Sequence, residues 1–272
     1  MSVIQTKDGT GIYYKDWGTG RPIVFSHGWP LTADAWDAQM LFLGQNGYRV
    51  IAHDRRGHGR SDQVGVGNDM DHWVADLAAL TEYLDLRDAV HIGHSTGGGE
   101  VARYVARFQD RVSKAVLVAS LTPNMVKTGA NPAGQPQEWF DQVRAGVLGN
   151  RSEFFRAVPE GPFYGFNRPG AEPSEAVIAN WWRQAMAGSA QAHYETVFSW
   201  LEDYTEDLQR ITVPVLVMHG DDDQIVPFAS SVPRAVDLLK NGVLRTYPGF
   251  PHGMLTTHAD VLNPDLLAFI RS

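Results

Sequence analysis

Short apolar runs alternate with stretches of helical periodicity along most of the chain. The apolar runs predict strands at residues 22–26, 48–54, 89–92, 115–119, 215–218 and 243–247. Apolar residues at three- and four-residue steps predict helices at residues 33–46, 68–84, 101–108 and 262–269. Strands that alternate with helices form parallel sheets with crossover connections. The pattern therefore predicts an α/β fold with a mostly parallel, doubly wound sheet.

The ends of several elements are marked by turn and cap residues. Residues 3–6 and 11–17 flank a Lys-Asp-Gly-Thr turn, which predicts an antiparallel hairpin at the start of the chain. Asn68 is a suitable N-cap for the helix that follows it, because an Asn side chain can accept a hydrogen bond from the first helical turn.

One long segment interrupts the alternation. Residues 123–210 contain no core-type strand, but they contain many prolines among helical pieces rich in Trp and Phe. A structureless loop of this length is implausible inside a compact domain. We therefore expect a core domain made of residues 1–122 and 211–272, with residues 123–210 inserted as a helical cap.

The composition narrows the classes of function. The 272-residue chain is 43% hydrophobic and 20% charged, an ordinary balance for a globular protein. Its formal net charge of −8 argues against a nucleic-acid binder, which usually carries a basic face. The absence of cysteine excludes disulfides, a thiolate nucleophile and cysteine-ligated metals. No run approaches the roughly 18 apolar residues of a membrane helix, and no apolar leader opens the chain, so we expect a cytoplasmic protein.

The first chemical signal is a Gly-x-Ser-x-Gly pattern at residues 93–97, between a predicted strand and a predicted helix. In this context the pattern is a nucleophile elbow, a sharp turn that exposes the serine hydroxyl. The helix N-terminus adds positive partial charge near a developing oxyanion. Ser95 is therefore the candidate nucleophile. We expect His94 to pack away from it, and Glu100 and Arg103 to be structural ion-pair partners.

The second signal is the sequence His-Gly-Trp-Pro at residues 27–30, just after the strand at 22–26. In a fold with a nucleophile elbow, one oxyanion donor comes from this loop, and the other is the N–H of the residue after the nucleophile. These positions nominate the backbone N–H groups of Trp29 and Thr96 as the oxyanion hole.

Two later loops offer a carboxylate and a base. Residues 221–223 are three consecutive aspartates after the strand at 215–218, and His252 lies between Pro and Gly after the last predicted strand. Sites of open α/β sheets lie at the carboxyl edge of the strands, so both loops can reach Ser95. The aspartates do not have the spacing of an EF-hand calcium loop, and no nearby pair of histidines supplies ligands, so we expect no metal.

These motifs together resemble the α/β-hydrolases, specifically the cofactor-free (non-heme) haloperoxidase/perhydrolase and arylesterase group. The matching stretches are residues 15–18, 25–30, 54–61, 93–104, 219–227 and 251–253. The resemblance implies an α/β-hydrolase fold that needs no cofactor. It further implies Ser95 as the nucleophile, His252 as the base and Asp223, the last of the three aspartates, as the residue that orients the base. Serine, aspartate and histidine occur here in the chain order of α/β-hydrolase triads.

These roles imply a serine hydrolase that cleaves small carboxylic esters through an acyl-enzyme. His252 would take the proton of Ser95 during attack on the acyl carbonyl, and water would then release the acid. Hydrogen peroxide in place of water would give a peracid, which can oxidise halide without a metal. The resemblance thus implies perhydrolase and haloperoxidase activity beside ester hydrolysis.

The expected walls of the site favour an aryl or short acyl ester. Trp29, Phe163, Ile225 and Phe228 are aromatic or aliphatic and lie on loops or cap segments near the motifs. The expected partners are therefore a small-molecule ester and hydrogen peroxide, with neither nucleic acid nor a membrane. The sequence leaves open whether the chain forms a homo-oligomer.

Other functions on the same scaffold stay open. A lactamase, an amidase or a C–C bond hydrolase can use the same three residues. A serine at the elbow disfavours a haloalkane dehalogenase or an epoxide hydrolase, which need a carboxylate nucleophile there. A non-catalytic binding protein is the remote alternative, because a fold does not determine a function. Covalent labelling of Ser95 by a fluorophosphonate would separate an enzyme from a binding protein.

Overall fold

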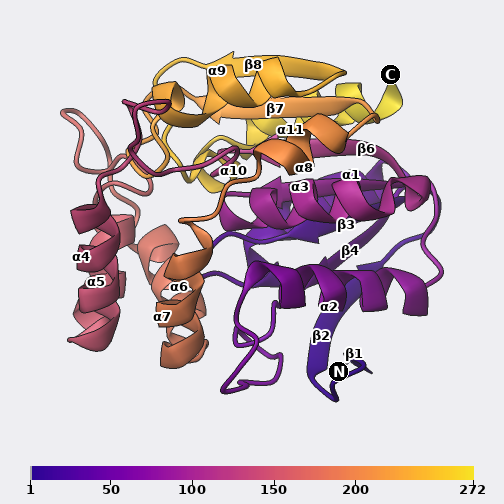
Figure 1. The fold of residues 1–272 in the computed structure, drawn as a ribbon, viewed down its shortest axis with the longest axis horizontal. Helices are drawn as coiled ribbons and strands as arrows, with labels where there is room; N and C mark the ends of the chain where they lie inside the picture. The colour runs from indigo at the N-terminus through magenta and orange to yellow at the C-terminus, as the bar shows by residue number, and fades with distance from the viewer. Residues whose placement is uncertain (1) are drawn as a thin grey trace.

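Eight strands form one sheet in the computed structural model, which describes residues 2–272 (Figure 1). In chain order the strands are β1 (Val3–Gln5), β2 (Gly11–Trp17), β3 (Pro22–Ser26), β4 (Arg49–His53), β5 (Ala89–His94), β6 (Val112–Val118), β7 (Val215–Gly220) and β8 (Gly242–Tyr247). Across the sheet their order is β1-β2-β4-β3-β5-β6-β7-β8. The β1–β2 and β2–β4 pairs are antiparallel, and all other pairs are parallel. The predicted hairpin and the mostly parallel sheet are confirmed.

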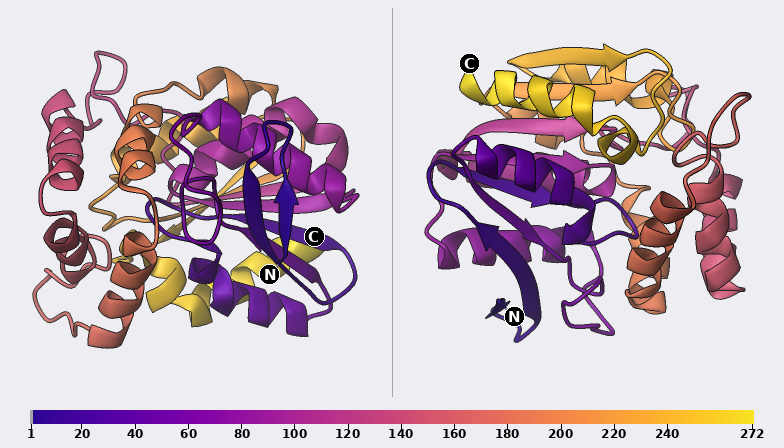
Figure 2. Two further views of the ribbon diagram at one scale, coloured as in Figure 1. Left: turned by 90° about the horizontal axis from the view of Figure 1, so that it is seen from below. Right: turned by 180° about the vertical axis from the view of Figure 1, so that it is seen from behind.

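Helices cover both faces of this sheet. The helices that pack on the sheet, or connect to those that do, are α1 (Asp37–Gln45), α2 (Met70–Tyr83), α3 (Thr96–Phe108), α8 (Thr205–Arg210), α9 (Phe228–Leu238), α10 (Met254–Thr257) and α11 (Ala259–Arg271), with short 3-10 turns at Ala33–Trp36 and Gln109–Arg111. Helices α2, α3, α8 and α9 lie on one face (Figure 1), and α1 and α11 lie on the other (Figure 2, right). Within residues 2–272, no helix is long and apolar enough to cross a membrane. The cytoplasmic location stays a prediction.

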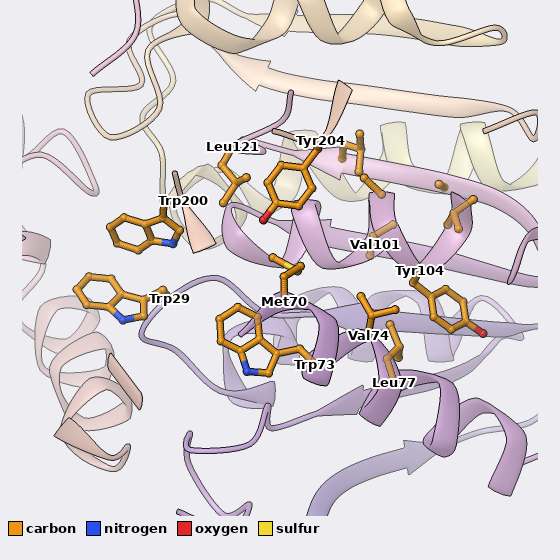
Figure 3. Packing of buried hydrophobic residues seen from close by; sticks show 14 of the residues in the cluster. Trp29, Met70, Trp73, Val74, Leu77, Val101, Tyr104, Leu121, Trp200 and Tyr204 are labelled. Carbon is orange, nitrogen blue, oxygen red and sulfur yellow. The ribbon is translucent and has the colours of Figure 1, made fainter. Parts of the chain in front are cut away.

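Alternation along the strands divides the core into two clusters. Val24 of β3 belongs to the cluster under α2 and α3, whereas its neighbours Ile23 and Phe25 belong to the cluster under α1 and α11. Successive side chains of a strand point to opposite faces, so both faces are buried and the strand reads as a continuous apolar run. Figure 3 shows the first cluster, in which Trp73 of α2 and Tyr104 of α3 are fully buried.

Four further helices lie beyond one end of the sheet (Figures 1 and 2). They are α4 (Gln137–Leu148), α5 (Arg151–Glu160), α6 (Glu175–Met186) and α7 (Ala190–Ser199), and all belong to the segment predicted as a cap. In residues 123–210 the structure has isolated β-bridges but no strand. Helix α8 ends the segment, and it packs against α3 and α9 in the layer over the sheet. The boundaries of core and cap stay a prediction.

Two local predictions differ from the structure. Asp69, not Asn68, caps α2, because its side chain accepts the N–H of His72 at 3.0 Å. The Asn68 side chain instead donates to Glu195 of α7, a contact over more than a hundred residues that local sequence does not reveal. Strand β6 begins at Val112, three residues earlier than predicted. The prediction began too late because two polar residues interrupt the apolar run of this strand.

Candidate active site

Ser95 lies at a sharp turn between β5 and α3, and its backbone is strained. Its φ of 54° and ψ of −118° fall outside the regions favoured by residues with a side chain. Both glycines of the motif are required sterically. A Cβ at Gly93 would lie 2.1 Å from the carbonyl oxygen of Gly97, and a Cβ at Gly97 would lie 2.2 Å from that of Ser26. The N–H of Ser95 donates to the carbonyl of Val118 at 3.0 Å, which fixes the turn on the neighbouring strand.

The structure brings one of the three loop aspartates to the candidate base. Asp223 Oδ2 lies 2.7 Å from His252 Nδ1, and both side chains are buried. A carboxylate only accepts, so Nδ1 carries the hydrogen and Nε2 is left as the proton acceptor. The other two aspartates are used elsewhere: Asp221 accepts a backbone N–H at 2.6 Å, and Asp222 pairs with Arg168.

Asp223 is held in its ionised form by the groups around it. Its Oδ1 accepts the N–H groups of Ile225 and Val226 at 2.9 and 2.8 Å, and its Oδ2 also lies 3.2 Å from Nε2 of His219. Burial opposes ionisation, but His252 and His219 outweigh it, so the pKa of Asp223 is held well below its usual range. The sequence did not single out His219. Among residues 2–272, no group of three or more His, Asp or Glu side chains is arranged to hold a metal ion.

Ser95 and His252 line one cavity of about 180 Å³. Its other lining residues are all apolar or aromatic: Trp29, Trp139, Val143, Phe154, Val158, Pro162, Phe163, Trp181, Trp200 and Ile225. No hydrogen bond joins Ser95 to His252 in the described part of the chain. In enzymes without substrate such contacts are often loose and tighten only when substrate binds.

Three of the four predicted wall residues, Trp29, Phe163 and Ile225, line this cavity. The ring of Phe163 stands edge-on to that of His252, with the centroids 5.1 Å apart. The prediction for Phe228 is corrected. Phe228 is the first residue of α9, and the helix start turns its ring edge-on to His219 at 6.0 Å, so it packs behind the aspartate loop and not on the cavity wall.

Both predicted oxyanion donors have backbone N–H groups without an acceptor among residues 2–272. Thr96 is the first residue of α3, where an N–H has no intrahelical partner. The side chains of both residues are fixed by the cap. Trp29 Nε1 donates to the carbonyl of His193 at 3.1 Å, and Trp200 Nε1 donates to the Thr96 hydroxyl at 2.9 Å. The role of the two N–H groups as an oxyanion hole stays a prediction.

The polar residues near the elbow take structural roles, one of them unforeseen. His94 packs as expected, but its Nε2 also lies 3.1 Å from the carbonyl oxygen of His252, so it ties the elbow to the loop of the base. Burial and His252 lower the pKa of His94 to about 3, so its ring is neutral. Glu100 and Arg103 are ion-pair partners, as expected. Glu100 pairs with Arg55, and Arg103 pairs with acidic residues on and before α8.

Known proteins share the fold of this chain and, in part, its sequence. Residues 21–259 match the family model described as the alpha/beta hydrolase fold. A non-heme haloperoxidase of Rhodococcus erythropolis is 62% identical over 274 residues, and the alignment covers 100% of both chains. A bifunctional esterase/perhydrolase of Acinetobacter calcoaceticus is 58% identical over 276 residues, again with 100% of both chains covered.

Among solved structures, a bromoperoxidase from Bacillus anthracis superposes with a TM-score of 0.94 at 34% identity and covers 100% of both chains. The resemblance inferred from the motifs is confirmed. The chain belongs to the α/β-hydrolase fold family, within the group that contains the non-heme haloperoxidases and perhydrolases.

Proposed function

We propose that the protein is a serine hydrolase of small carboxylic esters that also transfers acyl groups to hydrogen peroxide. The observation that carries the proposal is the shared cavity of Ser95 and His252, with Asp223 2.7 Å behind the base. The free N–H groups of Trp29 and Thr96 add the oxyanion donors such chemistry needs. The esterase/perhydrolase that is 58% identical supports both activities.

The first half-reaction acylates the serine. His252 Nε2 removes the proton of Ser95 Oγ while Oγ bonds to the acyl carbon, and the carbonyl electron pair moves onto oxygen. The N–H groups of Trp29 and Thr96 bind that oxyanion, at roughly 3 kcal/mol of transition-state stabilisation for each donor. Asp223 stabilises the imidazolium. When the tetrahedral intermediate collapses, the leaving alcohol takes the proton from His252.

The second half-reaction releases the acyl group. His252 takes a proton from water or from hydrogen peroxide, and the oxygen that is freed attacks the acyl carbon. Ser95 leaves with the proton and is restored. Water gives a carboxylic acid, and peroxide gives a peracid. The peracid transfers its terminal oxygen to a halide ion, with uptake of a proton, so that hypohalous acid and the carboxylic acid are the products.

The cavity favours small, apolar acyl groups. Its volume of about 180 Å³ and its aromatic walls suit a short acyl chain or an aryl group. A lactam, an amide or a C–C bond flanked by a carbonyl could enter the same chemistry. These alternatives become the next substrates to test if esters fail.

The decisive experiment compares hydrolysis of p-nitrophenyl acetate by the wild type, Ser95→Ala and Ser231→Ala. Ser231 is a buried serine of α9 outside the cavity, so its variant controls for loss of a hydroxyl. We expect Ser95→Ala to lose roughly a thousandfold or more in rate and Ser231→Ala to keep it. Peroxide should add a peracid product in the wild type and in Ser231→Ala, but not in Ser95→Ala. Equal rates in the wild type and Ser95→Ala would refute the proposed nucleophile.

A further inference from the structure

The N–H of Trp29 belongs to a peptide group whose carbonyl is tightly held. That carbonyl, of Gly28, accepts the Nδ1–H of His27 at 2.8 Å and the N–H of Leu31 at 2.9 Å. In a trans peptide the C=O and N–H bonds point in opposite directions. The two donors that fix the Gly28 carbonyl therefore also fix the direction of the Trp29 N–H, and they polarise that N–H bond.

His27 can play this part only in one tautomer. A carbonyl accepts but never donates, so Nδ1 must carry the hydrogen. The other ring nitrogen, Nε2, accepts the backbone N–H of Arg55 at 3.0 Å. The ring is fully buried, and burial together with the charge of Arg55 keeps the pKa of His27 well below its usual value. The neutral tautomer with Nδ1–H is the form that satisfies both contacts.

Arg55 holds the same residue a second time and joins it to α3. Its Nη2 donates to the backbone carbonyl of His27 at 2.8 Å. The same guanidinium pairs with Glu100 through Nε at 3.0 Å and Nη2 at 2.6 Å. Glu100 lies on the helix that begins at Thr96. One ion pair thus connects the loop that carries the Trp29 N–H with the helix that carries the Thr96 N–H.

Stability alone is a weak reason for this ion pair. The side chains of Arg55 and Glu100 are 1% and 0% exposed. The desolvation of two buried charges can cancel their attraction, and apolar residues of similar size often replace such pairs without loss. Burial opposes ionisation of Glu100, yet Arg55 and His53 outweigh it and lower the pKa of Glu100 to about 2, so the pair stays charged.

We propose that Arg55 and Glu100 are positioning residues that act through His27 to set the relative placement of the two oxyanion donors. This inference rests on the proposed function, because it presupposes that the N–H groups of Trp29 and Thr96 bind the oxyanion. It assigns no contact between the ion pair and the substrate.

The neighbouring residue provides a matched control. Arg56 forms a second buried ion pair with Asp76 of α2, with Nε and Nη2 2.6 and 2.5 Å from the carboxylate and both side chains 3% exposed. None of its side-chain hydrogen bonds reaches His27 or the cavity lining. Arg56→Lys and Asp76→Asn therefore damage a buried ion pair of the same kind without touching the oxyanion loop.

The test compares Arg55→Lys and Glu100→Gln with these two controls in the full chain. Three quantities are measured: kcat per active site, with sites counted by fluorophosphonate labelling of Ser95; KM for p-nitrophenyl acetate; and the affinity of an aryl trifluoromethyl ketone, whose adduct places an oxyanion in the hole. We expect kcat and ketone affinity to fall in parallel by about tenfold or more, while KM changes by less than about threefold. The controls should lower the melting temperature but leave kcat and ketone affinity within about twofold.

The outcome that overturns the proposal is a variant of Arg55 or Glu100 that melts earlier but keeps kcat per labelled site and ketone affinity. If Arg55→Lys does not fold, two variants of His27 test the proposal instead. His27→Asn keeps a donor near the position of Nδ1 and should recover part of the kcat that His27→Leu loses; equal kcat in both variants would also overturn it. Failure of the proposed function is distinguishable, because the wild type itself would then not be labelled.

Discussion

His94 Nε2 donates to the backbone carbonyl of His252 at 3.1 Å, so the residue before the nucleophile holds the loop of the base. His94→Phe keeps a ring of similar size in the buried site but removes the donor. We expect roughly tenfold lower kcat in ester hydrolysis, because a small displacement of a catalytic group is costly. His94→Gln retains a donor, so its kcat should lie between those of His94→Phe and the wild type. If His94→Phe has the kcat of the wild type, the hydrogen bond does not position His252.

Asp223→Asn should cost about ten-thousandfold in kcat with little change in fold. The Asn oxygen can still accept the N–H groups of Ile225 and Val226, and its amide then faces His252 Nδ1. The hydrogen of the imidazole must then move from Nδ1 to Nε2. A protonated Nε2 can no longer accept the proton of the serine. The matched control is Asp222→Asn, because Asp222 pairs with Arg168 and not with His252. Its kcat should stay within about threefold of the wild type, and a loss equal to that of Asp223→Asn would contradict the assignment.

Acid should unfold this protein in a narrow range of pH. Burial is the largest cause of a lowered pKa in five buried histidines, His27, His58, His91, His94 and His193, and it brings the pKa of His58, His91 and His94 to about 3. As the pH falls below about 6.5, the unfolded chain binds protons that the native chain does not. Each such histidine removes up to about 1.4 kcal/mol of unfolding free energy per pH unit. We therefore expect cooperative loss of circular dichroism between about pH 6 and pH 4.

One of these histidines gives a direct check of the cause. Neither ring nitrogen of His91 has a partner among residues 2–272, and the ring stacks on Tyr104 at 4.5 Å. His91→Leu should reduce the loss of unfolding free energy between about pH 7 and about pH 5, measured in urea, by roughly 2 kcal/mol in total. An unchanged dependence would mean that His91 is protonated in the native state.

The signals that were read correctly from sequence are local, and those that were missed are contacts over long distances. The elbow at Ser95 is a strand, a turn and a helix in series, and Gly93 is required sterically by Gly97 of the same motif. By contrast, the ion pair of Glu100 and Arg55 joins residues that are 45 positions apart in the sequence, and no periodicity indicates such a pair. The direction of a side chain at a helix start is equally hidden, which is why Phe228 was expected on the cavity wall. Asp223 was chosen from three aspartates by resemblance and not by chemistry.

The aromatic walls should limit the length of the acyl chain. Trp139 of α4 lines the cavity and is only half-buried, so its truncation opens space without emptying the core. Each methylene of the acyl chain that is buried in the enlarged cavity contributes about 0.8 kcal/mol to binding. For Trp139→Ala we expect the ratio of kcat/KM for p-nitrophenyl hexanoate to that for the acetate to rise about tenfold or more. Leu148→Ala, an exposed position at the end of the same helix, should leave the ratio unchanged. A constant ratio in Trp139→Ala would show that the acyl chain does not lie against this wall.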